Sequence, residues 1–102
     1  MYNVAIIGAG QLGSRHLQAM KTASSSLNIW VMDNHEESLK VAKQRYEEIP
    51  MIGEKSIEYV GSIDLLPQQL DLVIIATGSK PRASIVKKLL KCSKVKYLVL
   101  EK

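Results

Sequence analysis

The run Asn3-Val4-Ala5-Ile6-Ile7-Gly8-Ala9-Gly10-Gln11-Leu12-Gly13 decides the fold of this 102-residue chain. Its first part is a short apolar stretch rich in valine and isoleucine, which predicts a strand buried on both faces near the centre of a parallel sheet. Its second part is a glycine turn, and the residues from 11 to 22 that follow predict a helix ended by three consecutive serines. The sequence therefore begins with a strand, a glycine turn and a helix.

The same alternation continues along the rest of the chain. Apolar runs predict further strands at residues 28–33, 57–60, 71–77 and 97–100, with a helical turn at 64–69. One helix is predicted from the acidic pair 36–37 to about Glu48, and another has Pro81 in its first turn and Ile85, Val86, Leu89 and Leu90 facing inward. This order predicts one α/β domain over residues 1–102, a Rossmann-type doubly wound parallel sheet with strand order 3-2-1-4-5 and helices on both faces.

Composition and charge exclude several classes of protein. A lone cysteine rules out an internal disulfide, no Cys/His cluster has metal-ligand spacing, and the start of the chain shows no secretion signal, so we expect a cytoplasmic protein without a metal. No apolar stretch is long enough to cross a membrane. The net charge of +4 reflects an excess of basic residues from Lys80 onward, with Tyr97 as the one aromatic residue among them. We interpret them as a solvated helix face, and expect no nucleic-acid partner.

The glycine turn predicts a dinucleotide site because of its context. Gly8 permits the tight turn, Gly10 lets the backbone approach a pyrophosphate, and Gly13 lets the helix pack closely on the strand. The helix N-terminus that begins at Gln11 and Leu12 offers unpaired N–H groups and partial positive charge to phosphates.

A second group of residues completes this prediction. Asp33 ends the second strand twenty positions after Gly13, where a carboxylate can accept hydrogen bonds from the adenosine ribose; its alternative role is to cap the second helix. The same charge would repel a 2′-phosphate and no arginine follows it, so we expect NAD(H) rather than NADP(H). Thr77 and Gly78 lie at the predicted topological switch point and are either cofactor contacts or an ordinary turn.

Taken together, these residues resemble the N-terminal nucleotide-binding domain of the glucose-fructose oxidoreductase, inositol dehydrogenase and rhizopine-catabolism (Gfo/Idh/MocA) family. The segment from Gly8 to His16 has the histidine that often stands three places after the last glycine in that family. Residues 71–77 look like its fourth strand, which ends in Ala-Thr, and Glu101-Lys102 looks like the start of its Glu-Lys-Pro motif. The resemblance spans the whole chain.

The resemblance implies an NAD-dependent oxidoreductase that acts on a sugar, cyclitol or related hydroxyl compound. It implies a role for Lys102 in proton transfer to or from the substrate hydroxyl; a solvated chain end is the alternative. It also implies a second, substrate-binding domain that nothing here matches, so we expect this chain to be a fragment that binds cofactor without turnover. Arg82 stands where many members have a histidine, and we expect it to extend the basic helix face.

Two other functions remain open at this stage. A non-catalytic NAD(H)-sensing module would use the same turn without needing a catalytic lysine. A methyltransferase also has a glycine loop and an acid after its second strand, but the step from Gly10 to Gly13 fits the dinucleotide turn better. The residues leave open the substrate, the direction of reaction and the oligomeric state, for which a homo-oligomer is one option.

Overall fold

Five parallel strands form a single sheet in the order β3-β2-β1-β4-β5, which confirms the predicted Rossmann-type topology. The computed structural model describes residues 1–77 and 79–101, without the side chains of Ser79 and Lys80. In chain order the elements are β1 (Tyr2–Ile7), α1 (Gln11–Thr22), β2 (Leu27–Met32), α2 (Glu36–Glu47), β3 (Lys55–Val60), the 3-10 helix η1 (Ile63–Leu65), β4 (Gln69–Ile75), α3 (Ser79–Cys92) and β5 (Lys94–Leu100).

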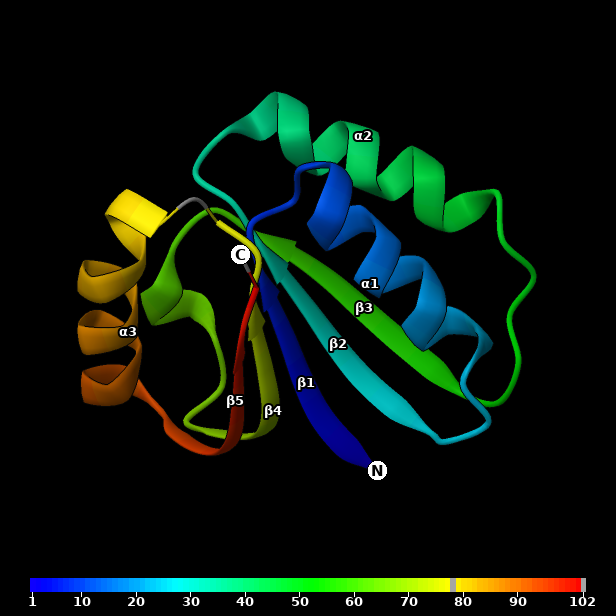
Figure 1. Cartoon of the computed structure of the whole chain (residues 1–102). Coiled ribbons are helices and arrows are strands. Elements are labelled where there is room, and N and C mark those ends of the chain that lie inside the picture. The colour runs from blue at the N-terminus through cyan, green and yellow to red at the C-terminus, as the bar shows by residue number, and fades with distance from the viewer. Residues whose placement is uncertain (78, 102) are drawn as a thin grey trace.

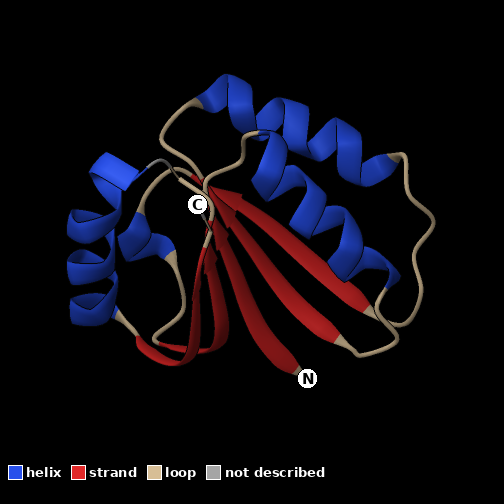
Figure 2. Ribbon diagram, viewed as in Figure 1, coloured by secondary structure: helices blue, strands red, loops and turns tan. Residues whose placement is uncertain are grey.

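Helices cover both faces of the sheet, as Figures 1 and 2 show, with α1 and α2 on one face and α3 with η1 on the other. Alternate side chains of β1 point to opposite faces and so belong to two separate apolar clusters. Val4 and Ile6 pack with residues of α1 and α2, whereas Ala5 and Ile7 pack with residues of η1 and α3. This double burial explains why the first strand of the sequence is apolar throughout.

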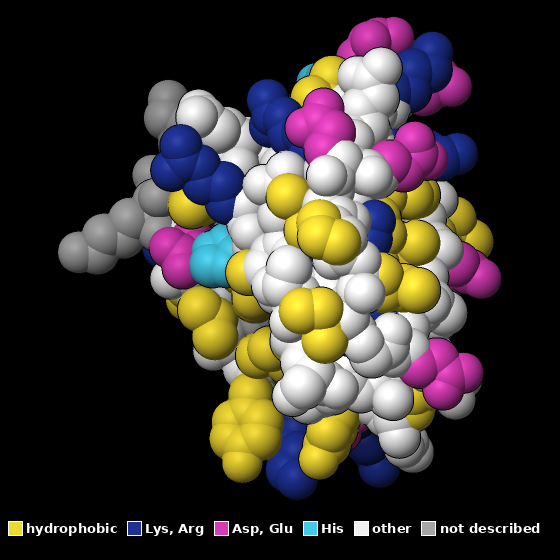
Figure 3. Space-filling model, turned by 90° about the vertical axis from the view of Figure 1, so that its right-hand side faces the viewer, with side chains coloured by type: hydrophobic (Ala, Val, Ile, Leu, Met, Phe, Trp, Pro, Cys, Tyr) yellow, Lys and Arg dark blue, Asp and Glu magenta, His cyan; other side chains and the backbone are white. Residues whose placement is uncertain are grey.

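The outer surface carries charges of both signs. Figure 3 shows acidic and basic side chains mixed over α2, as expected for a solvated helix face. Among the described residues, no helix combines the length and the apolar character that a membrane crossing requires.

Several element boundaries differ from the sequence-based prediction, and β5 begins at Lys94, three residues earlier than predicted. The predicted helical turn at 64–69 is only the short η1, and β4 already begins at Gln69, where it pairs with Lys94 at the start of β5. Strand β3 begins at Lys55, two residues earlier than predicted. These polar residues belong to the strands because they pair with a neighbouring parallel strand. A lysine is also well tolerated in a strand at the edge of a sheet. Leu90, predicted to face inward, is 55% exposed because Leu89 beside it already fills the core position.

A lysine fastens the loops at the edge of the sheet where the strands begin. Lys55 Nζ donates hydrogen bonds to the backbone carbonyls of Ala23 and Ser25, both at 2.8 Å, and also to that of Ile52. Three carbonyl acceptors match the three donors of an ammonium group. Lys55 therefore fixes two loops at the opposite end of the strands from the glycine turn.

Candidate dinucleotide-binding site

The glycine turn connects β1 to α1 in the way its three glycines predict. Gly8 has φ +102°, and a Cβ atom there would lie 3.0 Å from the carbonyl carbon and oxygen of Ala76. A Cβ at Gly13 would lie 1.8 Å from the Gly8 carbonyl oxygen, whereas one at Gly10 would meet nothing within 4 Å. Two glycines are thus required by the fold itself, and Gly10 instead leaves open space on the outside of the turn.

Backbone hydrogen bonds hold this turn against the neighbouring strands. The Gly8 N–H donates to the Met32 carbonyl at 2.8 Å, and the Ala76 N–H donates to the Ile7 carbonyl at 2.8 Å. Buried Ser14 donates from its hydroxyl to the Ala9 carbonyl at 3.3 Å. The turn is therefore fixed by β2 and β4 on its two sides and by the first turn of α1.

The N-terminus of α1 is left uncapped. Gly10 is the N-cap, no acidic residue lies in the first helical turn, and among the described residues no side chain caps it. Counting from the N-cap, Ser14 is the first residue whose N–H has a helical hydrogen-bond acceptor: it donates to the Gly10 carbonyl at 2.9 Å. The N–H groups of Gln11, Leu12 and Gly13 therefore have no helical acceptor, and together with the helix dipole they favour an anion.

Asp33 joins the second strand to the glycine turn. Its Oδ2 accepts the Ala9 N–H at 2.8 Å, and its Oδ1 accepts the His35 N–H at 2.8 Å. The N-cap of α2 is His35, so the alternative in which Asp33 is the cap residue is wrong, although Asp33 does organise the chain just before that helix. The side chain is 13% exposed. Its Oδ1 also lies 3.3 Å from His35 Nδ1, whereas Oδ2 has only the Ala9 N–H and can accept a further hydrogen bond from a ligand.

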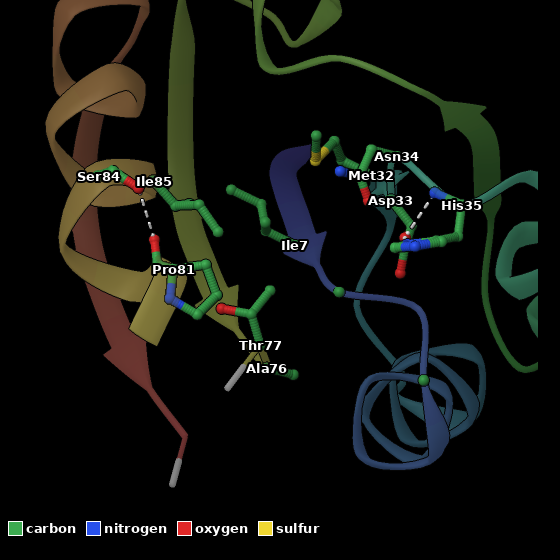
Figure 4. Close-up of a pocket in the computed structure, with 12 residues that line it drawn as sticks. Ile7, Met32, Asp33, Asn34, His35, Ala76, Thr77, Pro81, Ser84 and Ile85 are labelled. Carbon is green, nitrogen blue, oxygen red and sulfur yellow. Dashed lines mark hydrogen bonds and ion pairs between the residues drawn. The ribbon is translucent and has the colours of Figure 1, made fainter. Parts of the chain in front are cut away.

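A crevice of about 560 Å³ opens at the carboxyl ends of β1, β2 and β4. Figure 4 shows Asp33, Asn34 and His35 on one side, Pro81, Ser84 and Ile85 on the other, and Ile7 between them. The lining also includes Gly8, Gly10, Met32, Ala76 and Thr77. This is the topological switch point, where ligands of doubly wound sheets bind.

Thr77 shows that the crevice has an unused polar group. Its Oγ1 is buried and has no hydrogen-bond partner among the described residues, although the residue lines the crevice. A buried hydroxyl without a partner is costly, so a polar ligand in the crevice would relieve it. The sequence predicts Thr77 at the switch point, but nothing in it indicates that the hydroxyl lacks a hydrogen-bond partner among the described residues.

The other residues singled out in the sequence have different outcomes. Gly78 and Lys102 lie outside the described residues. Gln11 and Leu12 have exposed side chains that do not line the crevice, so only their backbone groups face a ligand at the helix end. Arg82 does not simply extend the basic face of α3, because it is half-buried and its guanidinium donates to the backbone carbonyl of Glu101.

Sequence reasoning missed the α3 side of the crevice. Pro81, Ser84 and Ile85 line it, whereas the sequence pattern predicts only a helix start at Pro81 and a core position at Ile85. The available signal was the topology, since the helix that follows the fourth strand begins beside the switch point.

The comparison with protein families agrees with this geometry. Residues 2–102 match the family described as an oxidoreductase family with an NAD-binding Rossmann fold. The chain belongs to the Gfo/Idh/MocA family. Within that family it has the fold and glycine turn of the nucleotide-binding domain, and no curated protein matches it significantly.

Solved structures share the fold of this Gfo/Idh/MocA member at low sequence identity. A Bacteroides fragilis protein described as an NADP oxidoreductase superposes with a TM-score of 0.71 at 18% identity, over 99% of this chain and 36% of that one. A diketoreductase acting on dicarbonyl compounds has a TM-score of 0.69 at 22% identity, over 98% of this chain and 41% of the other. The chain therefore spans well under half the length of either protein.

The residues present fit a dinucleotide. Gly10 leaves room for a phosphate beside uncapped amides, Asp33 offers free acceptor capacity at one side, and Thr77 has an unsatisfied hydroxyl near the other. These three features match the phosphate, ribose and polar contacts that such a ligand requires.

Proposed function

We propose that residues 1–102 form the cofactor domain of an NAD-dependent oxidoreductase that acts on a sugar, cyclitol or related hydroxyl compound. In this proposal the chain alone binds NAD(H) but does not turn over substrate. A bound nicotinamide supplies hydride transfer, and Lys102 assists the proton transfer by resemblance to the family. A cytoplasmic location, without a membrane or nucleic-acid partner, completes the proposal.

The observation that carries the proposal is the link between Asp33 and the glycine turn. The carboxylate accepts the Ala9 N–H at 2.8 Å, inside the turn whose next residues carry the uncapped amides of α1. A pyrophosphate held at those amides places the adjoining ribose next to Asp33, because the two features are joined by a hydrogen bond. Thr77 and Gly78 then contact the part of the cofactor that crosses toward β4.

The charges around the crevice favour NAD(H) over NADP(H). The described residues that line it include Asp33 and His35 but no lysine or arginine. A 2′-phosphate would bring negative charge to the carboxylate without a cation to neutralise it. One structural neighbour is described as an NADP oxidoreductase, so NADPH is the competitor that a test must include.

Isothermal titration of the chain with NADH and NADPH tests this proposal. We expect NADH to bind at least about tenfold more tightly, which corresponds to about 1.4 kcal/mol. Asp33→Asn should reduce this preference, because it removes the charge and keeps a similar shape. Asp64→Asn is the matched control, since Asp64 is exposed in η1 and bonds only Ser62 in the nearby chain.

Two results would count against the proposal. A wild-type chain that binds no NADH, or binds NADPH as tightly, would refute the cofactor assignment. Turnover of a panel of sugars and cyclitols with NAD⁺, followed by NADH absorbance, should be absent with this chain; measurable turnover would refute the view that a second domain is needed.

A further inference from the structure

A second hollow lies between α1 and α2, away from the glycine turn. It has a volume of about 260 Å³ and a polar lining, made up of Gln11, Ser14, Arg15 and Gln18 from α1 with Arg45 and Glu48 from the end of α2. The α1 residues stand three or four positions apart, which places them on one face of the helix. None of these six residues lines the crevice at the carboxyl ends of the strands. We call this hollow the arginine groove.

Contacts between the two helices fix the walls of the arginine groove. Helices α1 and α2 lie side by side on the same face of the sheet (Figure 1). Gln18 Nε2 donates to the Arg45 carbonyl at 3.0 Å, and one helical turn further on Lys21 Nζ donates to the Tyr46 carbonyl at 2.6 Å. The Lys21 ammonium also lies 4.2 Å from the centre of the Tyr46 ring, which is a cation–π contact. The two walls are therefore held at a fixed separation.

Arg15 and Arg45 give the arginine groove its positive charge. Arg15 is exposed and Arg45 is half-buried. Among the described residues, neither guanidinium group has an ion-pair or hydrogen-bond partner. Each guanidinium carries five N–H donors in a planar fork, which matches the oxygens of a phosphate or carboxylate group. These donors, one set from each helix, are therefore available to an anion in the groove.

The size and charge of the arginine groove indicate a small anion rather than a second dinucleotide. The groove has less than half the volume of the crevice, which is about 560 Å³. Among the described residues that line it, only Glu48 is acidic, so two arginines and one glutamate leave a net charge of +1. An adjoining hollow shares Gln11 and Arg15 with the groove and adds Leu12, whose side chain is 37% exposed. That hollow offers space for a short carbon chain attached to the anion.

We propose that the arginine groove binds a phosphate group, either as free phosphate or as a monoester of a small molecule. Arg15 and Arg45 donate charge-assisted hydrogen bonds to the phosphate oxygens from opposite walls, and the Gln11 side-chain amide adds a neutral donor. In a monoester, the carbon part lies over Leu12. This binding goes beyond the proposed cofactor function, because the groove shares no lining residue with the crevice and needs no NAD(H).

An NMR titration of the isotope-labelled chain with inorganic phosphate, at constant ionic strength, tests this inference. We expect the Nε–H resonances of Arg15 and Arg45 and the side-chain amide of Gln18 to shift with a common midpoint. Arg15→Gln and Arg45→Gln should each weaken the affinity at least about fivefold, since each removes charge-assisted hydrogen bonds. Glu48→Gln should strengthen the affinity about twofold to threefold, because it removes a negative charge beside the anion.

Lys43→Gln is the matched control, because Lys43 is exposed on α2 and does not line the arginine groove. It removes the same charge and should leave the phosphate affinity within about twofold. Arg45→Lys should recover part of the loss seen in Arg45→Gln, since lysine keeps the charge but lacks the planar fork. Glycerol phosphate separates the two sources of the phosphate group. Tighter binding than inorganic phosphate, with a shift at Leu12, identifies a monoester, whereas equal or weaker binding identifies free phosphate.

The positions of the shifted resonances separate the arginine groove from the glycine turn, which is itself expected to attract phosphate. Shifts confined to Gly8, Gly10 and their neighbours in the turn would refute the inference. An unchanged affinity in Arg15→Gln would also refute it. So would an equal loss in Lys43→Gln, because phosphate would then respond only to the overall charge. A chain that binds phosphate in the groove but binds no NADH would refute the proposed function and leave this inference intact.

Discussion

An alanine at Gly10 should separate cofactor binding from folding. The Cβ atom would enter open space, with nothing within 4 Å, and the backbone at φ −72° and ψ −164° suits any residue. We expect stability to stay the same or rise by up to about 1 kcal/mol, since alanine restricts the unfolded chain more than glycine does. The methyl group would occupy the space through which a pyrophosphate approaches the amides, so NADH binding should weaken at least about tenfold.

An alanine at Gly13 is the matched variant with the opposite effect. Its Cβ would lie 1.8 Å from the Gly8 carbonyl oxygen and 2.9 Å from the carbonyl carbon, so α1 and the turn must move apart. Overpacking costs about 3 kcal/mol at the upper end, and the better helix propensity of alanine offsets about 1 kcal/mol. The net loss of about 2 kcal/mol lowers Tm by roughly 8–16 °C in a domain of this size.

Thermal unfolding followed by circular dichroism, together with NADH titration, measures both effects. Gly10→Ala should unfold within a few degrees of the wild type yet bind NADH poorly. If Gly10→Ala bound NADH as well as the wild type does, the turn would not be the phosphate site. If Gly13→Ala kept the wild-type Tm, the close approach of α1 to the turn would not limit stability.

Three further variants test the same structure. Thr77→Val should keep or raise the free energy of unfolding in urea by about 1 kcal/mol, because it removes a buried hydroxyl without a partner, while titration shows weaker NADH binding. Lys55→Met should lower the free energy of unfolding by about 2–3 kcal/mol through loss of three carbonyl contacts, with unchanged NADH affinity because the site is remote. Burial raises the pKa of Tyr59 to about 12, so the unfolded chain loses this proton first and stability should fall as pH rises from about 10 to 12. Urea unfolding at both ends of that range should show a fall on the order of 1 kcal/mol, reduced by partial exposure of the ring, that Tyr59→Phe abolishes.

The sequence predicted the parts of the fold that local pattern controls. The apolar run before Gly8 and the spacing of the glycines predicted β1 and the turn, since burial on two faces and a positive φ each leave a recognisable residue choice. The ends of strands were less predictable. Lys94 and Gln69 pair with each other at the start of β5 and β4, and nothing local to either residue indicates a partner 25 positions away.

In the candidate site too, the residue types could be predicted from the sequence, whereas the contacts between different elements could not. Asp33 was predicted as a ligand for a ribose, and the structure adds that it holds the Ala9 N–H and the chain before α2. That additional role depends on how closely β2 approaches the turn, which spacing alone does not specify. Arg82 was predicted to lie on a solvated face because basic residues predominate from residue 80 onward, but its guanidinium contacts Glu101, which lies beyond the end of β5.

These contacts suggest why the ligand-facing turn of a small domain can be ordered before a ligand arrives. The carboxylate of Asp33 already holds one N–H of the turn, and Ser14 holds the Ala9 carbonyl, so the amides at the start of α1 have fixed directions. A ligand that meets fixed amides loses less entropy to ordering the protein. The glycines leave space for the ligand, and Asp33 holds the turn in place through its hydrogen bond with the Ala9 N–H. The glycine turn and Asp33 therefore act together, and each depends on the other.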